Sequence, residues 1–178
     1  MQMRPEVQIA AMIKALTDVV IPAVPPSNKL ASEQAQLVVG MLHLMAAQLP
    51  VQFRFDRDEL GRLLETASEL SSLAVAEEAP RAALAELDRQ RTEAMAVLEA
   101  CRGEPAQLQA SVASLRTSMC SLVDSFAASE DVVARERVET ALFAMSKAQL
   151  LRDRALMKPQ RWEPDPAAVP DITSLLAG

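Results

Sequence analysis

The sequence is poor in the residues on which most catalytic and binding motifs depend. Among its 178 residues are four glycines, two cysteines, one histidine and no tyrosine, and aromatic residues make up only 3%. The glycines are far apart, so no phosphate-binding loop forms, and neither a nucleophile elbow nor a kinase signature occurs. Two cysteines do not make a disulfide scaffold. The few glycines and the excess of alanine and leucine exclude collagen-like and all-β folds.

The histidine and cysteines also lack the spacing of a metal site. A ferritin-type di-iron site needs two Glu-x-x-His pairs, but Gly40 stands three residues before His43, which is the only histidine. Cys101 and Cys120 lack the paired spacing of a zinc site, and we expect both to be small core residues. The sequence therefore predicts no metal, no cofactor and no catalytic residue, which favours a protein that is not an enzyme.

The charge balance and the apolar runs bear on partners and compartment. The net charge is −6, and no run of three basic residues occurs, so the surface repels phosphate backbones. The longest apolar run, Leu37 to Ala47, is too short to span a bilayer. The N-terminal stretch is interrupted by Glu6 and Lys14 and has no signal-peptide core. We expect a soluble cytoplasmic protein that binds neither nucleic acid nor membrane.

The prolines divide the chain into segments with helical periodicity, because proline does not continue a helix interior. The six segments are approximately 5–21, 28–49, 57–77, 80–102, 105–128 and 130–158. They predict an all-α fold, an up-and-down antiparallel helical bundle in one domain over 1–158. The last four segments would form a four-helix core, and the first two would pack alongside it or mediate a dimer. Segments 57–77 and 80–102 also fit one long helix kinked at Pro80.

Each segment repeats apolar residues at helical spacing, and we expect these stripes to face the core. In segment 5–21 the stripe comprises Ile9, Met12, Ile13, Leu16, Val19 and Val20. In segment 28–49 it comprises Leu30, Leu37, Val38, Met41, Leu44 and Met45. In segment 105–128 the spacing alternates between four and three, as in a coiled-coil seam, over Leu108, Val112, Leu115, Met119, Leu122 and Phe126.

Local signals indicate where some of these helices begin and end. Asp56 and Glu59 are spaced like a capping box, with Phe55 before them as a hydrophobic staple. Alternatively, Phe53 and Phe55 form an exposed recognition patch. Ser129 is the expected N-cap of the last segment, and Gly103 suits the end of segment 80–102.

Several polar residues fall on the stripes, where burial requires a partner. Arg91 lies in the stripe of segment 80–102, and Glu65 or Glu69 is its expected partner from the neighbouring helix. Gln149 and Arg152 occupy the stripe of the last segment, as Gln34 and Gln48 do in segment 28–49. These side chains either form structural pairs at the edge of the core or line an anion pocket between helices.

His43 points away from the main stripe of its segment, so we expect it on the surface or at a second helix contact. The residues that follow it lack the lysine and glycine that histidine-phosphotransfer domains carry three and four residues after their histidine. The proline-rich tail, 159–178, ends in an apolar hook formed by Ile172, Leu175 and Leu176. It is either a flexible end or a strap that docks on its own or a neighbouring subunit.

These observations favour a non-enzymatic protein that acts through protein–protein contacts, by self-association as a homodimer or as an adaptor. Segments 5–21 and 28–49 carry wide apolar faces, and a surplus of apolar surface usually indicates a partner. The alternative is a small-molecule binder that holds an apolar or acyl-type ligand between helices; an enzyme with an interhelical cleft is the third hypothesis. In a homodimer, the two N-terminal segments or the tail either stay with their own subunit or are exchanged between subunits, and the sequence leaves both arrangements open.

Overall fold

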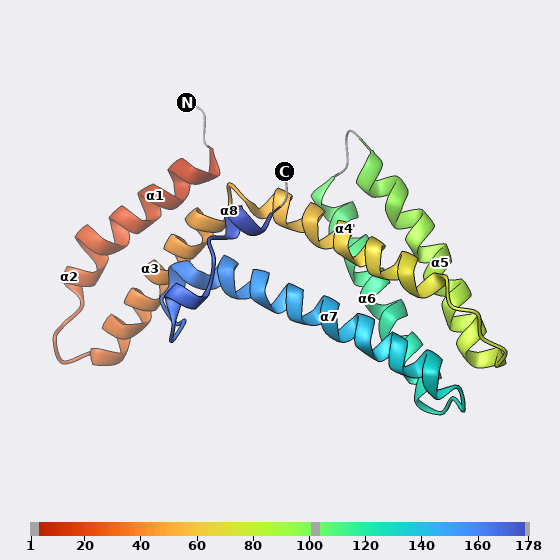
Figure 1. Cartoon of the computed structure of the whole chain (residues 1–178). Helices are drawn as coiled ribbons and strands as arrows, with labels where there is room; N and C mark the ends of the chain where they lie inside the picture. Colours follow the sequence, from red (N-terminus) through yellow and green to blue (C-terminus); the bar gives the residue numbers. More distant parts are fainter. Residues whose placement is uncertain (1–3, 101–103, 177–178) are drawn as a thin grey trace. The chain divides into compact units, whose positions relative to one another are not determined.

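The computed structural model describes residues 4–100 and 104–176, and its fold is all-α and 82% helical, as predicted. Consecutive helices make antiparallel contacts (Figure 1). The contacts group into two compact units. Unit 1 comprises the chain up to Gln52 together with Arg152–Leu175, and unit 2 comprises Phe53–Leu151 and the residues from Leu176 on. A single domain over 1–158 stays a prediction.

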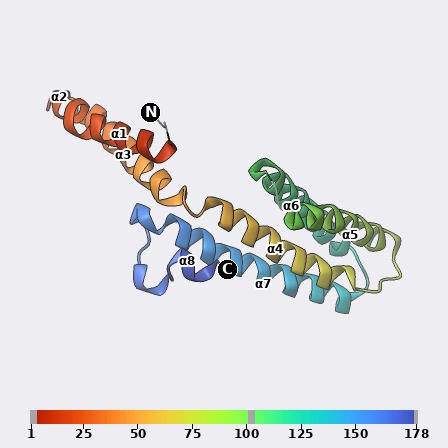
Figure 2. The same cartoon turned by 90° about the horizontal axis from the view of Figure 1, so that it is seen from above.

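Unit 1 is built on an N-terminal helical hairpin. Its first arm runs through α1 (Pro5–Ala15), a π-helical turn η1 (Leu16–Val20) and α2 (Ile21–Ala23), and its second arm is α3 (Lys29–Gln48). The two arms lie side by side in both views (Figures 1 and 2). Asn28 caps α3, because its side-chain oxygen accepts the N–H of Ala31 at 3.2 Å. The predicted segments 5–21 and 28–49 are thus confirmed as helical.

The π-helical turn corrects the predicted stripe of the first arm. In the turn the N–H of Ile21 donates to the carbonyl of Leu16, which widens the helix by one residue. Pro22 follows directly, and a proline ring disfavours a regular turn immediately before it. The wider turn keeps Ile21 half-buried on the side of Leu16. Val19 and Val20, which were predicted to continue the stripe, are exposed.

Unit 2 contains the predicted four-helix core. Its helices are α4 (Gln52–Ser71), α5 (Glu78–Glu99), α6 (Pro105–Ala127) and α7 (Val132–Met157), of which α7 extends into unit 1. One cluster of buried apolar side chains draws on all four. All six residues of the predicted α6 stripe are in it, each no more than 9% exposed. This stripe is confirmed in full because α6 has helices packed around it.

The start of α4 differs from the prediction. The helix begins at Gln52, so Asp56 and Glu59 lie within it rather than at its cap, and both are buried. Phe55 is therefore a buried residue of the first turns and not a staple. The alternation of apolar and charged residues before Asp56 resembles a loop in sequence, but on a helix it places one phenylalanine inside and the other outside.

Segments 57–77 and 80–102 form two helices, not one. α4 ends at Ser71, and a connection of non-helical residues precedes α5, where Pro80 occupies the first turn. Proline is tolerated there because the N–H that it lacks would have no partner within the helix. Gly103, the expected end of segment 80–102, lies outside the described residues. α6 begins with a capping box between Glu104 and Gln107.

The start of α7 is capped differently from the prediction. Asp131, not Ser129, is the N-cap, since its Oδ1 accepts the N–H of Ala134 at 2.9 Å. Ser129 is buried, and its hydroxyl donates to Oε1 of Glu77 at 2.8 Å. The same oxygen accepts the backbone N–H of Glu130 at 3.1 Å. A carboxylate from the α4–α5 connection therefore holds the α6–α7 connection and the start of α7 in place.

The tail is docked on the end of its own α7. It contains two short 3-10 turns, η2 (Lys158–Gln160) and η3 (Pro166–Ala168), and the single-turn helix α8 (Ile172–Leu175). Arg154 pairs with Glu163 through two nitrogens, and Lys158 donates to the carbonyl of Val169 at 2.6 Å. Val169 is fully buried. Of the two predicted alternatives, the structure has a strap on its own chain.

Candidate functional site

The hairpin of unit 1 packs through the small-residue side of α3. A row of half-buried residues on α3 recurs at intervals of three and four residues, and three of its five members are alanines: Ala31, Ala35, Val39, Leu42 and Ala46. Opposite them, α1 contributes Ile9, its only buried residue, with Ile13 half-buried. Small side chains let two helices approach closely, so this side, rather than the side with large residues, is the one used within the chain.

The large apolar side of α3 is consequently exposed. We call this surface the α3 seam, and its members are each 39–67% exposed: Leu30, Leu37, Val38, Met41, Met45 and Leu49. The prediction that this stripe faces the core is therefore wrong for every member except Leu44, which is half-buried. In the described part of unit 1 these side chains stay exposed, which leaves a row of large apolar side chains in contact with water.

Charges are scarce on the hairpin and cancel there. Of the 18 basic and 24 acidic side chains in the chain, three of each sign lie within the first 52 residues. The six are Arg4, Glu6, Lys14, Asp18, Lys29 and Glu33. After Glu33 the next charged residue is Arg54, so the middle and end of α3 carry none. The seam thus lies on a neutral helix within an otherwise acidic protein.

Three polar residues of α3, His43, Gln34 and Gln48, differ in their exposure and in their position relative to the seam. His43 is exposed, on the opposite side of α3 from Leu37 and Met41 by helical register. Gln34 is exposed within the seam. Gln48, near the end of α3, is half-buried, and its Nε2 donates to Sδ of Met157 at 3.6 Å. The end of the seam is therefore partly occupied by the end of α7, and its beginning is open.

The other predicted site residues lie apart from the seam. Arg91 is half-buried, and its guanidinium pairs with Asp88 one turn earlier at 2.7 Å, so the partner is in its own helix and is neither Glu65 nor Glu69. Arg152 donates to the carbonyl of Leu175 at 3.2 Å, within the tail. Arg91 belongs to unit 2 and Arg152 to unit 1.

Gln149 belongs to a polar group that joins α4 to α7. Its Oε1 accepts a hydrogen bond from Arg62, which also pairs with Asp58. A second pair, between buried Glu59 and Arg116, joins α4 to α6. Neither Arg62 nor Glu59 was predicted to pair with a residue of another helix. Both hold helices together through satisfied contacts, which is a structural role.

Phe53, Phe55 and Cys120 do not form a common site. Phe53 is 44% exposed and stacks under Arg57, whose Cζ lies 6.0 Å from the ring centroid. Phe55 is buried, so the two rings do not form one patch. Cys120 is an exposed free thiol on α6, which contradicts its assignment to the core, and Cys101 lies outside the described residues.

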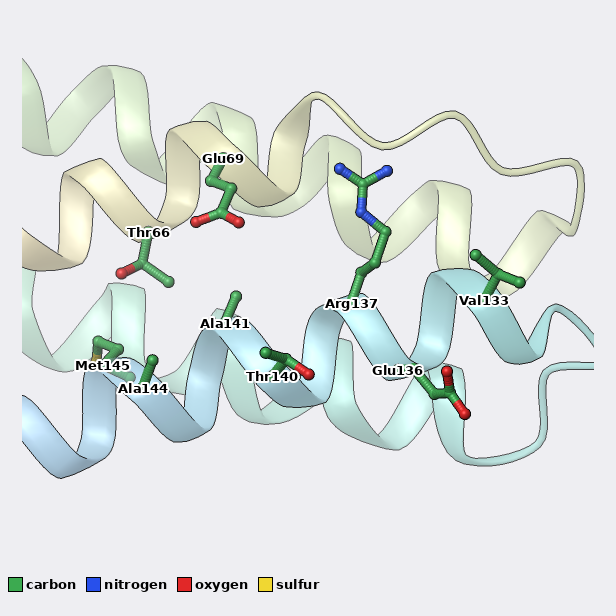
Figure 3. Close-up of a pocket in the computed structure, with 9 residues that line it drawn as sticks. All are labelled: Thr66, Glu69, Val133, Glu136, Arg137, Thr140, Ala141, Ala144 and Met145. Atoms are coloured by element: carbon green, nitrogen blue, oxygen red, sulfur yellow. The ribbon is translucent and has the colours of Figure 1, made fainter.

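Unit 2 also has an open groove between α4 and α7, with a volume of about 500 Å³. Figure 3 shows Glu69 and Arg137 reaching into it from opposite helices, above a floor that includes Ala141 and Ala144. Thr66, Thr140 and Glu136 also line it. An apolar or acyl-type ligand is best held in a dry and enclosed pocket. This groove is open and its rim is charged, so it does not suit such a ligand.

The strongest pKa shifts occur at exposed helix and tail pairs. The hydrogen bond from Arg89 lowers the pKa of Glu86 to about 2, and the same pair raises the pKa of Arg89. The hydrogen bond from Arg154 lowers the pKa of the Glu163 carboxyl. Each shift arises from an ion pair in water and not from a buried reactive group, so these residues are not candidates for acid–base catalysis.

Among residues 4–100 and 104–176, no group of three or more His, Cys, Asp or Glu side chains is placed to hold a metal ion. No single described helix is long and apolar enough to cross a membrane; α3 and α4 meet the length and composition criteria only as an interrupted pair. No family model, curated protein or solved structure matches the chain.

Proposed function

We propose that this is a non-enzymatic protein that acts by self-association, through the α3 seam of unit 1. The observation that carries the proposal is the exposure of the seam, six large apolar residues on a helix whose opposite sides are already packed or polar. Exposed apolar rows of this length are uncommon in a monomer and usually mark a protein interface. An adaptor role, with the same surface used for another protein, would follow from the same observation.

The neutrality of the hairpin favours a second copy as the occupant of the seam. Two copies of a protein with net charge −6 repel each other over most of their surfaces. The first 52 residues carry equal numbers of both signs, so contact there adds no net repulsion. A twofold interface uses the same patch on both subunits, and an apolar, neutral patch is complementary to itself.

The size of the hairpin is sufficient for a stable interface. A helical hairpin about 30 Å long and about 20 Å across offers on the order of 600 Å² on one broad side. Two such surfaces bury about 1,200 Å² together, which reaches the lower range of specific interfaces. The α3 seam together with part of α1 therefore offers enough area for a dimer.

The mass in solution tests this proposal, with a matched pair of substitutions. Met41→Lys places a charge in the seam, and Met95→Lys places the same charge at another exposed methionine, on α5 of unit 2. In light-scattering measurements after gel filtration we expect a dimer for the wild type and for Met95→Lys, and a monomer for Met41→Lys. If the wild type is a monomer at a protein concentration of about 100 μM, which is on the order of the Kd of a weak interface, the proposal is contradicted.

A further inference from the structure

The order of residues along the α3 seam points to one geometry for the dimer. Read as a heptad, α3 has leucine at all three d positions, Leu30, Leu37 and Leu44. The a positions are Gln34, Met41 and Gln48. Leucine at d is the residue found in two-stranded coiled coils, and a polar residue at a single a position fixes the register of the strands at a cost in stability. Unit 1 leaves the first part of this seam exposed, from Leu30 to Met41.

We infer that α3 pairs with α3 of a second copy in parallel and in register, with Gln34 opposite Gln34 of the other copy. This inference rests on the proposed self-association and specifies its geometry. In a parallel pair, each layer brings together equal positions, so the leucines meet leucines and Met41 meets its counterpart. The two Gln34 amides then face each other, and each can donate to the carbonyl oxygen of the other.

The antiparallel alternative is less favourable on the same residues. Antiparallel coiled coils place a positions against d positions. The register that aligns the exposed part, Leu30 to Met41, would set Gln34 against Leu37 and Met41 against Leu30. Each amide would then be buried against a leucine without a hydrogen-bond partner, which is costly. The glutamines therefore act against the antiparallel pairing, whereas the leucines and Met41 are compatible with both.

Charges on the flanking positions do not oppose the parallel arrangement. The e positions are Ala31, Val38 and Met45, and the g positions are Glu33, Gly40 and Ala47. Glu33 is the only charge among them, and in a parallel pair its neighbour across the interface is Val38. Like charges are thus not brought together. Val38 and Met45, both exposed in one chain, gain cover beside the a and d layers.

Cysteine cross-linking tests the geometry directly. In the full chain with both native cysteines replaced by serine, Gln34→Cys places a thiol at the central a position. Gln36→Cys places the control thiol on another exposed side of α3. Under mild oxidation we expect Gln34→Cys to form a disulfide dimer at least 10-fold faster than Gln36→Cys, because a disulfide requires Cα atoms within about 7 Å.

Two other results overturn the inference and separate it from the proposed function. A dimer by mass in which Gln34→Cys forms a disulfide only when mixed with Leu37→Cys shows an antiparallel pair; self-association then stands and the parallel geometry falls. A dimer that cross-links equally at Gln34 and Gln36 places the interface away from the a/d seam and also refutes the geometry. A monomer before oxidation overturns both proposals.

Discussion

Helices α3 and α6 carry similar apolar patterns but have opposite fates in the structure. On α6 all six stripe residues are at most 9% exposed, and on α3 the six seam residues are 39–67% exposed. α6 contributes to a core shared by four helices of unit 2. α3 packs against the first arm of the hairpin, and its row of large apolar residues stays exposed. The period of a stripe therefore predicts a helix and its apolar side, but the number of neighbouring helices decides whether that side is covered.

The two regions also differ in charge. Three basic and three acidic residues lie in the first 52 positions, and all the others, 15 basic and 21 acidic, lie beyond them. Helices α4 to α7 thus combine a filled core with a strongly charged surface, which keeps their outside in water. The hairpin has neither a large core nor a charged surface. This difference is what we would expect between a self-contained unit and a unit completed by association.

The largest effect is expected from truncation in the core of unit 2. Leu115 is fully buried on α6, so Leu115→Ala removes apolar contacts and leaves a cavity. We expect a loss of about 3 kcal/mol in the free energy of unfolding, measured by circular dichroism in urea. The control is Leu37→Ala on the seam, measured at a concentration where the protein is monomeric, which should cost less than about 1 kcal/mol. Equal losses would contradict the contrast between the two helices.

The second effect separates the two regions by their dependence on protein concentration. At a concentration 100 times the dimer Kd, association stabilises the folded hairpin by about 2.7 kcal/mol relative to the free monomer. Amide hydrogen exchange in α3 should therefore slow by about 100-fold on going from dilute to concentrated protein. The exchange of α6 amides, which belong to unit 2, should change much less. Protection of α3 that is independent of concentration would argue against the seam as an interface.

The third prediction concerns the carboxylate that caps α7 from a distance. Glu77→Ala removes the acceptor for the Ser129 hydroxyl and for the backbone N–H groups of Glu130 and Asp131. We expect a loss of about 1 kcal/mol in unfolding free energy, as for removal of a helix cap. Glu78→Ala, one residue further on, removes only an exposed pair with Arg81 and should cost less than about 0.5 kcal/mol. Similar effects for the two variants would contradict the cap.

The smallest effect is a pH-dependent loosening of the tail in unit 1. The hydrogen bond from Arg154 lowers the pKa of Glu163 below its ordinary value of 4.5. Its contribution to holding the tail is therefore complete above pH 4.5 and is lost as the pH falls through the lower, folded-state pKa. Trp162, the only tryptophan, lies next to Glu163 and reports on this step. Its fluorescence anisotropy should fall on acidification.

Glu163→Gln provides the control for the tail. This variant lacks the carboxylate and should show the lower anisotropy of Trp162 already at neutral pH, with a reduced pH dependence. If the wild type and the variant titrate alike, the pair between Arg154 and Glu163 does not hold the tail.

Most helices could be predicted from the sequence, but contacts between distant segments could not. The α6 stripe and the hairpin segments were predicted, because a run of regular apolar spacing bounded by proline specifies a helix locally. The start of α4 and the cap of α7 were missed. Phe55 and Asp56 fit a loop and a cap as well as they fit a helix, and the contact between Glu77 and Ser129 joins connections that are 52 residues apart. Local patterns do not contain such a contact.

The sequence by itself determined that the protein is all-α, where most helices lie, and that the N-terminal helices carry more apolar surface than a small unit can bury. Only the tertiary structure decided which side of α3 is used within the chain. The alanine side packs because small side chains permit a close approach, and most of the large side stays exposed because the end of α7 reaches only the end of the seam. The same choice turned the stripe that was expected in the core into the candidate interface.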